Sequence, residues 1–177
     1  VTTDADGTFT ATFDFSDVEP GTAVALAATP DEEETSTEGE VLLERSFEDP
    51  DPGDWEFVDE PPRSKRSSNW VFDDEAGVLR QTSNLYGFEG PPINAPGAVA
   101  VIGDEEWADY RTTVELSSED NDAIGVLVRA QDPDNFYRFS MDAEREYRWL
   151  VRKVEGETEL LWADEEGYEV GETYEVT

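Results

Sequence analysis

The sequence predicts an all-β protein whose short antiparallel strands form a sandwich or jelly roll. Alternating polar and apolar runs, rich in β-branched and aromatic residues, recur roughly every eight to twelve residues. Gly, Pro and Asp separate these runs at turn positions. No segment shows a sustained helical period, so we expect very little helix.

Residues 1–30 are expected to form the closing hairpin of an immunoglobulin-like module. Phenylalanines alternate with Thr and Asp in GTFTATFDFSD (7–17), a pattern typical of a half-buried strand. Glu19-Pro20-Gly21 marks a turn, and a strand of small apolar residues follows at 22–29. The segment resembles the end of immunoglobulin-like repeats in archaeal and bacterial surface proteins. Such a module would have its earlier strands outside this chain.

Residues 31–40, DEEETSTEGE, are predicted to be an acidic linker. The segment lacks apolar residues and carries a run of like charges, so it should be extended and solvated. A tether is the simplest interpretation. An interaction tail and Thr-linked glycosylation are the alternatives.

The remaining residues, 41–177, are expected to form one β-sandwich. Strands are predicted at 41–47, 55–58, 67–72, 78–82, 98–102, 107–117, 123–131, 136–141, 147–154, 158–163 and 174–177. The turn signal Asp132-Pro133-Asp134-Asn135 joins two of these strands into a central hairpin.

The charge of the chain restricts its partners. Twelve Lys and Arg against 45 Asp and Glu give 12 − 45 = −33, spread along the whole sequence. Such a charge makes phosphate backbones and anionic membranes poor partners, so we expect no nucleic acid. Only Lys65 and Lys153 are lysines. A halophilic source is expected, because counterions would screen the repulsion; an unusually acidic mesophilic surface protein is the alternative.

Several kinds of chemistry are excluded by composition. The chain has no Cys and no His, which removes disulfides, thiol chemistry, Ser-His nucleophiles and the usual zinc ligands. No apolar run has the length of a membrane span, so direct membrane insertion is not expected.

An ordered set of short motifs resembles a known family. The motifs are Ser68-Asn69-Trp70, Leu79-Arg80-Gln81, Gly103-Asp104, Trp107-Ala108-Asp109-Tyr110, Asp120-Asn121-Asp122-Ala123-Ile124-Gly125 and Asp134-Asn135-Phe136-Tyr137-Arg138-Phe139. They resemble the concanavalin A-like jelly rolls, including laminin G-like domains and above all the lectin-like domain that closes thrombospondins. The resemblance spans 41–177 and is strongest at 104–154.

This resemblance implies a calcium-binding acidic loop and a sandwich that serves adhesion or ligand binding. It also implies an extracellular or cell-surface location. Such domains continue with further strands beyond the region that matches 174–176. We therefore expect a sandwich truncated at its C-terminus, or one completed by another copy or chain.

The candidate calcium ligands lie in one short loop. Carboxylates and carbonyls are the hard oxygen ligands that calcium prefers. The candidates are Glu119, Asp120, Asn121 and Asp122, with Asp104 as a donor from a second loop. The spacing of an EF-hand is absent. In a chain with 45 acids, a merely solvated loop remains the alternative.

A second candidate site combines arginine and aromatic residues from the last strands. Aromatic rings stack on sugars, and arginine forks hydrogen-bond acidic groups. The candidate ligand-binding residues are Arg129, Tyr137, Arg138, Arg148 and Trp149. Alternatively, the arginines pair with surplus carboxylates, including Asp142 and Glu144.

Other aromatic and acidic residues are less informative. Trp55, Trp70, Trp107 and Trp162 recur within strand patterns and are expected to pack in the core. A glycosidase needs two carboxylates facing each other across a cleft. Glu115 stands alone on its strand, so catalysis is not expected.

These observations predict a non-catalytic, calcium-stabilised binding or adhesion module of a secreted or surface protein, with a glycan or surface polymer as partner. A structural unit of a surface layer, filament or appendage is one alternative. A divergent glycan-active hydrolase is another.

The calcium hypothesis predicts that chelation destabilises the protein. An ion at hundredfold excess over its dissociation constant contributes about 2.7 kcal/mol, which corresponds to several degrees in a domain of this size. The measurement is the thermal midpoint in high NaCl with calcium and with chelator. A difference under about 1 °C would count against a structural ion.

Overall fold

The protein is described from a computed structural model. The described residues are 2–3, 9–10, 41–45, 47, 52–59, 67–83, 92–94, 97–107 and 109–177. They fall into two compact units, one drawn from Val1–Asp31 and Glu105–Thr177 and the other from Glu32–Asp104. The predicted linker at 31–40 and the predicted strand at 22–29 lie outside the described residues.

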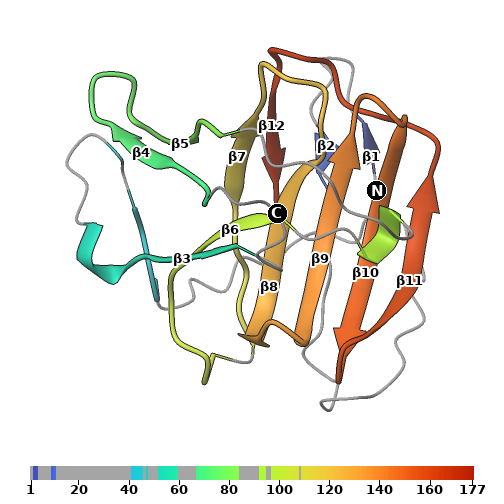
Figure 1. The fold of residues 1–177 in the computed structure, drawn as a ribbon, viewed down its shortest axis with the longest axis horizontal. Coiled ribbons are helices and arrows are strands. Elements are labelled where there is room, and N and C mark those ends of the chain that lie inside the picture. Colours follow the sequence, from blue (N-terminus) through green and yellow to red (C-terminus); the bar gives the residue numbers. More distant parts are fainter. Residues whose placement is uncertain are drawn as a thin grey trace. The chain divides into compact units, whose positions relative to one another are not determined.

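The prediction of an all-β protein is confirmed (Figure 1). The described helical structure consists of two 3-10 turns, η1 (Pro52–Asp54) and η2 (Pro92–Asn94). Within the described residues, no helix has the length and apolarity needed to cross a membrane.

The first unit is built around a four-stranded antiparallel sheet. Its strands are β8 (Ile124–Asp132), β9 (Asn135–Asp142), β10 (Tyr147–Val154) and β11 (Glu157–Asp164). Their order in the sheet is β11-β10-β9-β8, so each strand pairs with its neighbour in sequence. The sequence predicted all four strands, with boundaries within one residue.

Turn chemistry sets the register of two of these hairpins. Asp132 pairs with Asn135, and its carboxylate accepts a hydrogen bond from the Asp134 amide at 2.7 Å. The β10–β11 turn has φ values of 50° at Glu155 and 82° at Gly156. Two successive left-handed residues are the requirement of a type I′ turn, which matches the twist of the flanking strands.

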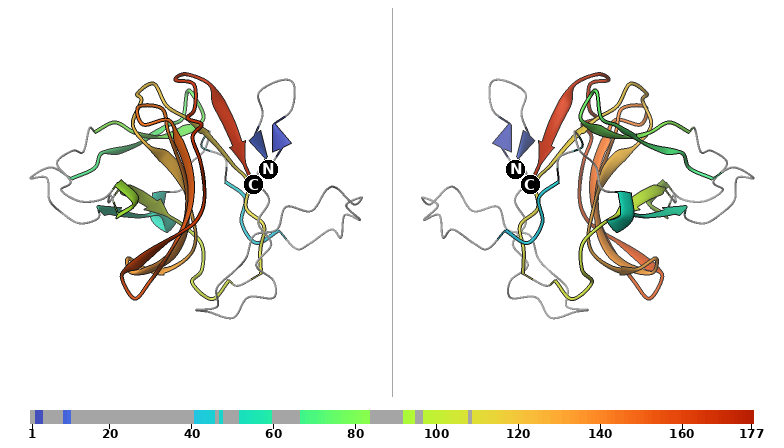
Figure 2. Two further views of the ribbon diagram at one scale, coloured as in Figure 1. Left: turned by 90° about the vertical axis from the view of Figure 1, so that its right-hand side faces the viewer. Right: turned by 90° about the vertical axis from the view of Figure 1, so that its left-hand side faces the viewer.

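One face of this sheet carries the hydrophobic core, and we call it the core face. Phe139, Met141 and Leu150 from the sheet cluster with Tyr168 and Val176. Val176 belongs to β12 (Thr173–Val176), which pairs antiparallel with β7 (Val114–Ser117). The side views show β12 lying across from the curved four-stranded sheet (Figure 2).

Strand β8 contains an irregularity at one of the candidate ligand residues. The register shifts between Val128 and Asp132, and Arg129 has φ of 52°. A bulge leaves a backbone group unpaired. Here the Arg129 amide donates a hydrogen bond to the Tyr110 hydroxyl at 2.7 Å.

The second unit contains two short antiparallel pairs. Strand β3 (Glu56–Asp59) pairs with β6 (Ala98–Val101), and β4 (Trp70–Asp73) pairs with β5 (Val78–Gln81). Each of these strands overlaps a predicted one.

Two sequence-based predictions of strands need correction. Residues 41–45 are not in a strand, and Val41 is 74% exposed; an apolar run without a partner strand forms no ladder. Of the strand predicted at 107–117, the described residues form a strand only in β7; Tyr110 lies outside it and contacts β8 through its hydroxyl. Near the N-terminus, β1 (Thr2–Thr3) pairs with β2 (Phe9–Thr10), a hairpin that the sequence analysis did not predict.

Replacing Gly125 with Ala should destabilise the sheet. A Cβ atom there would lie 2.1 Å from the Phe139 carbonyl oxygen and 2.9 Å from the Ser140 Cα. Because both are backbone atoms of the paired strand, we expect a loss of about 3 kcal/mol in the free energy of unfolding by chemical denaturation. Gly97→Ala is the matched control, since a Cβ there meets nothing within 4 Å. Equal stability of the two variants would contradict this packing.

Candidate functional site

The predicted calcium loop is folded by its own hydrogen bonds. The Ser118 hydroxyl donates to the Asp120 carbonyl at 3.0 Å and accepts from the Asp120 amide at 3.1 Å. The Asp120 carboxylate accepts from the Asn121 amide at 2.9 Å. Short polar side chains stabilise turns in this way by replacing backbone partners.

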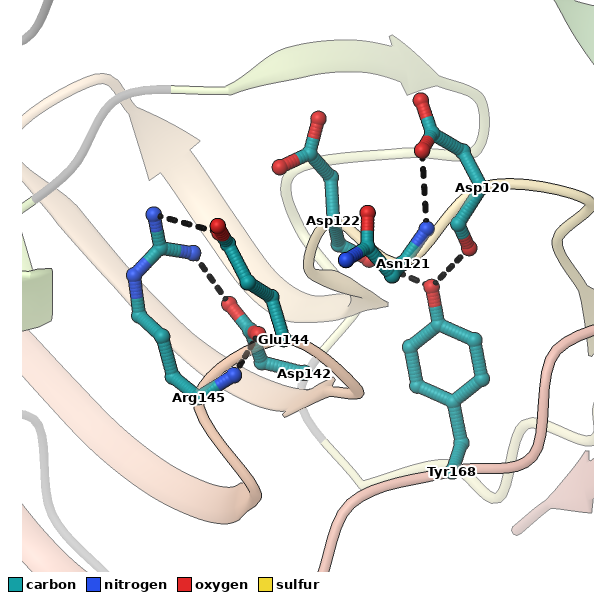
Figure 3. Close-up of polar contacts among 7 residues, drawn as sticks. All are labelled: Asp120, Asn121, Asp122, Asp142, Glu144, Arg145 and Tyr168. Carbon is teal, nitrogen blue, oxygen red and sulfur yellow. Dashed lines mark hydrogen bonds and ion pairs between the residues drawn. The ribbon is translucent and has the colours of Figure 1, made fainter.

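The buried hydroxyl of Tyr168 holds this loop from the inside. It lies 2.6 Å from the Asp120 carbonyl oxygen and 2.5 Å from that of Asp122 (Figure 3). A phenol has one proton, so it donates to one carbonyl at a time. Burial raises the pKa of Tyr168, with the hydrogen bond of Ser118 acting in the opposite direction. The hydroxyl therefore remains a donor at neutral pH.

Two backbone hydrogen bonds attach the loop to neighbouring segments. The Glu144 amide, in the β9–β10 turn, donates to the Asn121 carbonyl at 2.9 Å. The Gly171 amide donates to the Ser118 carbonyl at 2.8 Å. We call the assembly of 118–122, 142–145 and Tyr168 the acidic corner.

A fully buried carboxylate, Asp142, lies at the centre of this corner. Arg145 donates to it twice at 2.8 Å, from the backbone amide and from the guanidinium, and also pairs with Glu144 at 3.0 Å (Figure 3). The hydrogen bond to Asp142 raises the pKa of Arg145. A buried charge is tolerated only with such partners. Arg145 therefore pairs with both Asp142 and Glu144.

The corner carries an excess of negative charge. Burial raises the pKa of Asp122, and the carboxylates of Asp120, Glu144 and Asp142 raise it further, while Arg145 lowers it. A carboxyl whose pKa rises on folding stabilises the fold when protonated. Its contribution is lost as the pH rises through the folded-state pKa. The same negative potential favours a cation near Asp122.

The predicted calcium ligands lie on both units of the protein. Asp120, Asn121 and Asp122 share one loop, and the Asp120 and Asp122 carboxylates point away from Tyr168 (Figure 3). Glu119 is exposed on the same loop, whereas Asp104 belongs to the second unit. Across the described ranges, no group of three or more acidic side chains has an arrangement that could hold a metal. Calcium at this loop stays a prediction.

The predicted ligand residues do not share one surface. Side chains alternate between the faces of a strand. Ser140 pairs with Trp149 and lies two residues from Arg138, so these three side chains occupy the face opposite the core, which we call the Trp149 face. Tyr137 and Arg148 belong to the core face.

The residues on the core face have structural partners. Arg148 forms ion pairs with Asp164 and Glu166, the latter at 2.6 Å, and its guanidinium lies 5.9 Å from the Trp162 ring centroid. Tyr137 is buried and hydrogen-bonds Arg152. Packing and ion pairing therefore account for the presence of Tyr137 and Arg148 on the core face.

The Trp149 face carries aromatic and polar groups together, along with the fully buried side chains of Val151 and Asp142. The rings of Tyr147 and Trp149 stack with centroids 3.7 Å apart and an angle of 13°. Burial, followed by the charge of Asp142 and a hydrogen bond to it, raises the pKa of Tyr147 to about 12. The Ser140 hydroxyl is buried and has no hydrogen-bond partner among the described residues.

Sequence reasoning missed Tyr168 and Ser140. Tyr168 lies 46 residues beyond Asp122, in a segment without strand periodicity, and nothing local signals its contact. Ser140 could have been found, because strand alternation places it on the same face as Arg138.

Replacing Tyr168 with Phe should lower the free energy of unfolding by about 1–3 kcal/mol, because two carbonyls lose their buried donor. Asp120→Asn is the control, since it keeps the main-chain carbonyl and should change stability by less than about 0.5 kcal/mol. Both are measured by denaturant unfolding in chelator. A Tyr168→Phe protein as stable as the parent would show that the hydroxyl does not support the corner.

Comparisons with family models, with curated proteins and with solved structures yield no match for this chain.

Proposed function

We propose that this chain is a non-catalytic binding module whose ligand is a carbohydrate bound on the Trp149 face. The fold proposed for it is a concanavalin A-like jelly-roll sandwich. The core shared by the four-stranded sheet and the β7–β12 pair supports this fold, because two sheets facing one core make a sandwich.

The observation that carries the proposal is the Ser140 hydroxyl. A buried hydroxyl without a partner costs about 1–3 kcal/mol, so a structural role does not account for it. Its neighbours across the sheet are Gly125, which has no side chain, and Trp149. A sugar hydroxyl can pair with Ser140 while the ring stacks on an aromatic side chain.

The charges of the protein support two further parts of the proposal, an acidic sugar as ligand and an extracellular location. Arg138 lies on the same face, and its positive charge partly offsets the rise that burial and Asp142 cause in the pKa of Tyr147, so a cation is near enough to act on an acidic sugar. The net charge of −33 fits a protein of a salty extracellular medium, at a cell surface or secreted. A calcium ion in the acidic corner would add stability, while the ligand site itself needs only side chains of the sheet.

Replacing Ser140 with Ala separates binding from folding. Deleting an unpartnered hydroxyl should leave stability unchanged or slightly higher, while glycan affinity falls about tenfold. A glycan array on the parent protein identifies the ligand, and calorimetry on the best hit gives the affinities. Trp149→Phe should also weaken binding, because the stacking surface shrinks.

Ser117→Ala is the matched control, an exposed serine on β7. Full affinity in Ser140→Ala, or no glycan signal from the parent at any salt concentration, would refute the proposal. Concentration-dependent polymers in light scattering together with a silent array would favour the structural alternative, a unit that assembles with its own copies.

A further inference from the structure

The second unit contains a layer of five aromatic rings, which we call the ring layer. It consists of Phe47, Trp55, Phe57, Trp70 and Phe72. At one end, Phe57 of β3 stacks on Trp70 of β4 with ring centroids 5.7 Å apart and an angle of 23°. Phe57 is 41% exposed, so this end of the layer is accessible from solvent.

A carboxylate lies at the same end of the ring layer. Asp59 follows Phe57 by two residues on β3, which places both side chains on one face. The Oδ2 atom of Asp59 accepts a hydrogen bond from the Ser68 amide at 2.8 Å. Because Ser68 precedes Trp70 by two residues, this bond brings Asp59 beside the stacked pair.

Two buried polar atoms at this end have no hydrogen-bond partner among the described residues. They are the Oδ1 atom of Asp59, which can only accept when ionised, and the Nε1 atom of Trp70, which can only donate. Buried polar atoms are nearly always paired, so two exceptions in the same part of the second unit require an explanation.

The chemistry of the two atoms restricts the ligand. An ammonium group would satisfy Asp59 but has no acceptor for Trp70. A carboxylate or phosphate would accept from Trp70 but would be repelled by Asp59. A hydroxyl group both donates and accepts, so ligands with several hydroxyls satisfy both atoms and can pack on Phe57.

We propose that Phe57, Asp59 and Trp70 form a second binding site, for a neutral polyhydroxylated ligand such as a sugar. The site lies entirely within the second unit, so it is separate from the one proposed on the Trp149 face.

The test follows indole N–H resonances in ¹H–¹⁵N spectra of the full chain. The five tryptophans give five indole signals, and Trp70→Phe identifies that of Trp70. Glucose, galactose, mannose, xylose and sorbitol are titrated, with choline and acetate as cationic and anionic probes. We expect at least one sugar or sorbitol to shift the Trp70 signal saturably.

Asp59→Asn replaces the free acceptor with an amide and should weaken this response about tenfold or more. Asp74→Asn, in the exposed β4–β5 turn, is the matched control and should respond like the parent. The dispersion of each spectrum reports folding. The Trp149 signal reports the other site in the same titration, so either site can fail independently.

Three results would overturn the proposal. No saturable shift of Trp70 with any sugar or sorbitol would leave a bridging water only. A response to choline or acetate alone would show that the ligand is an ion. An undiminished response in folded Asp59→Asn would show that the carboxylate takes no part.

Discussion

The fold of the first unit depends on the acidic loop at 118–122. Uncharged hydrogen-bond donors from other segments hold this loop in place. Tyr168 places its hydroxyl between two carbonyls of the acidic loop, and the Glu144 and Gly171 amides attach the loop on either side. Backbone carbonyls of this kind are also the ligands that calcium uses. Here the protein's own hydroxyl and amide donors pair with these carbonyls, so the acidic corner can fold without a bound ion.

Four cations of the four-stranded sheet and its turns form ion pairs. Arg145, Arg148, Arg152 and Lys153 each contact a carboxylate. Exposed pairs of this type contribute little, whereas the pair between Arg145 and the fully buried Asp142 cannot lose one partner without a large penalty. The two proposed sites combine aromatic rings with hydrogen-bonding groups, namely the Ser140 hydroxyl and Arg138 in one and the Asp59 carboxylate in the other, and this mixture suits sugars.

The hairpins of the four-stranded sheet could be predicted because their signals are local. Alternation fixed the strands, and Glu155-Gly156 and Asp132–Asn135 carry the turn chemistry that the backbone requires. The residues that meet in the candidate sites were harder to predict from the sequence. Strand alternation alone separates Tyr137 from Arg138, but pairing Ser140 with Trp149 also requires the register of the β9–β10 hairpin. The contacts of Tyr168 with the acidic loop and of Asp59 with Ser68 join distant strands or loops, which no local pattern encodes.

Hydrogen exchange of the Glu144 and Gly171 amides in chelator tests the central claim most directly. If protein hydrogen bonds close the corner, both amides should exchange as slowly as neighbouring amides of β9 and β10. Exchange at the rate of an open chain in chelator, with protection only after calcium is added, would contradict the account and assign the closing role to the ion.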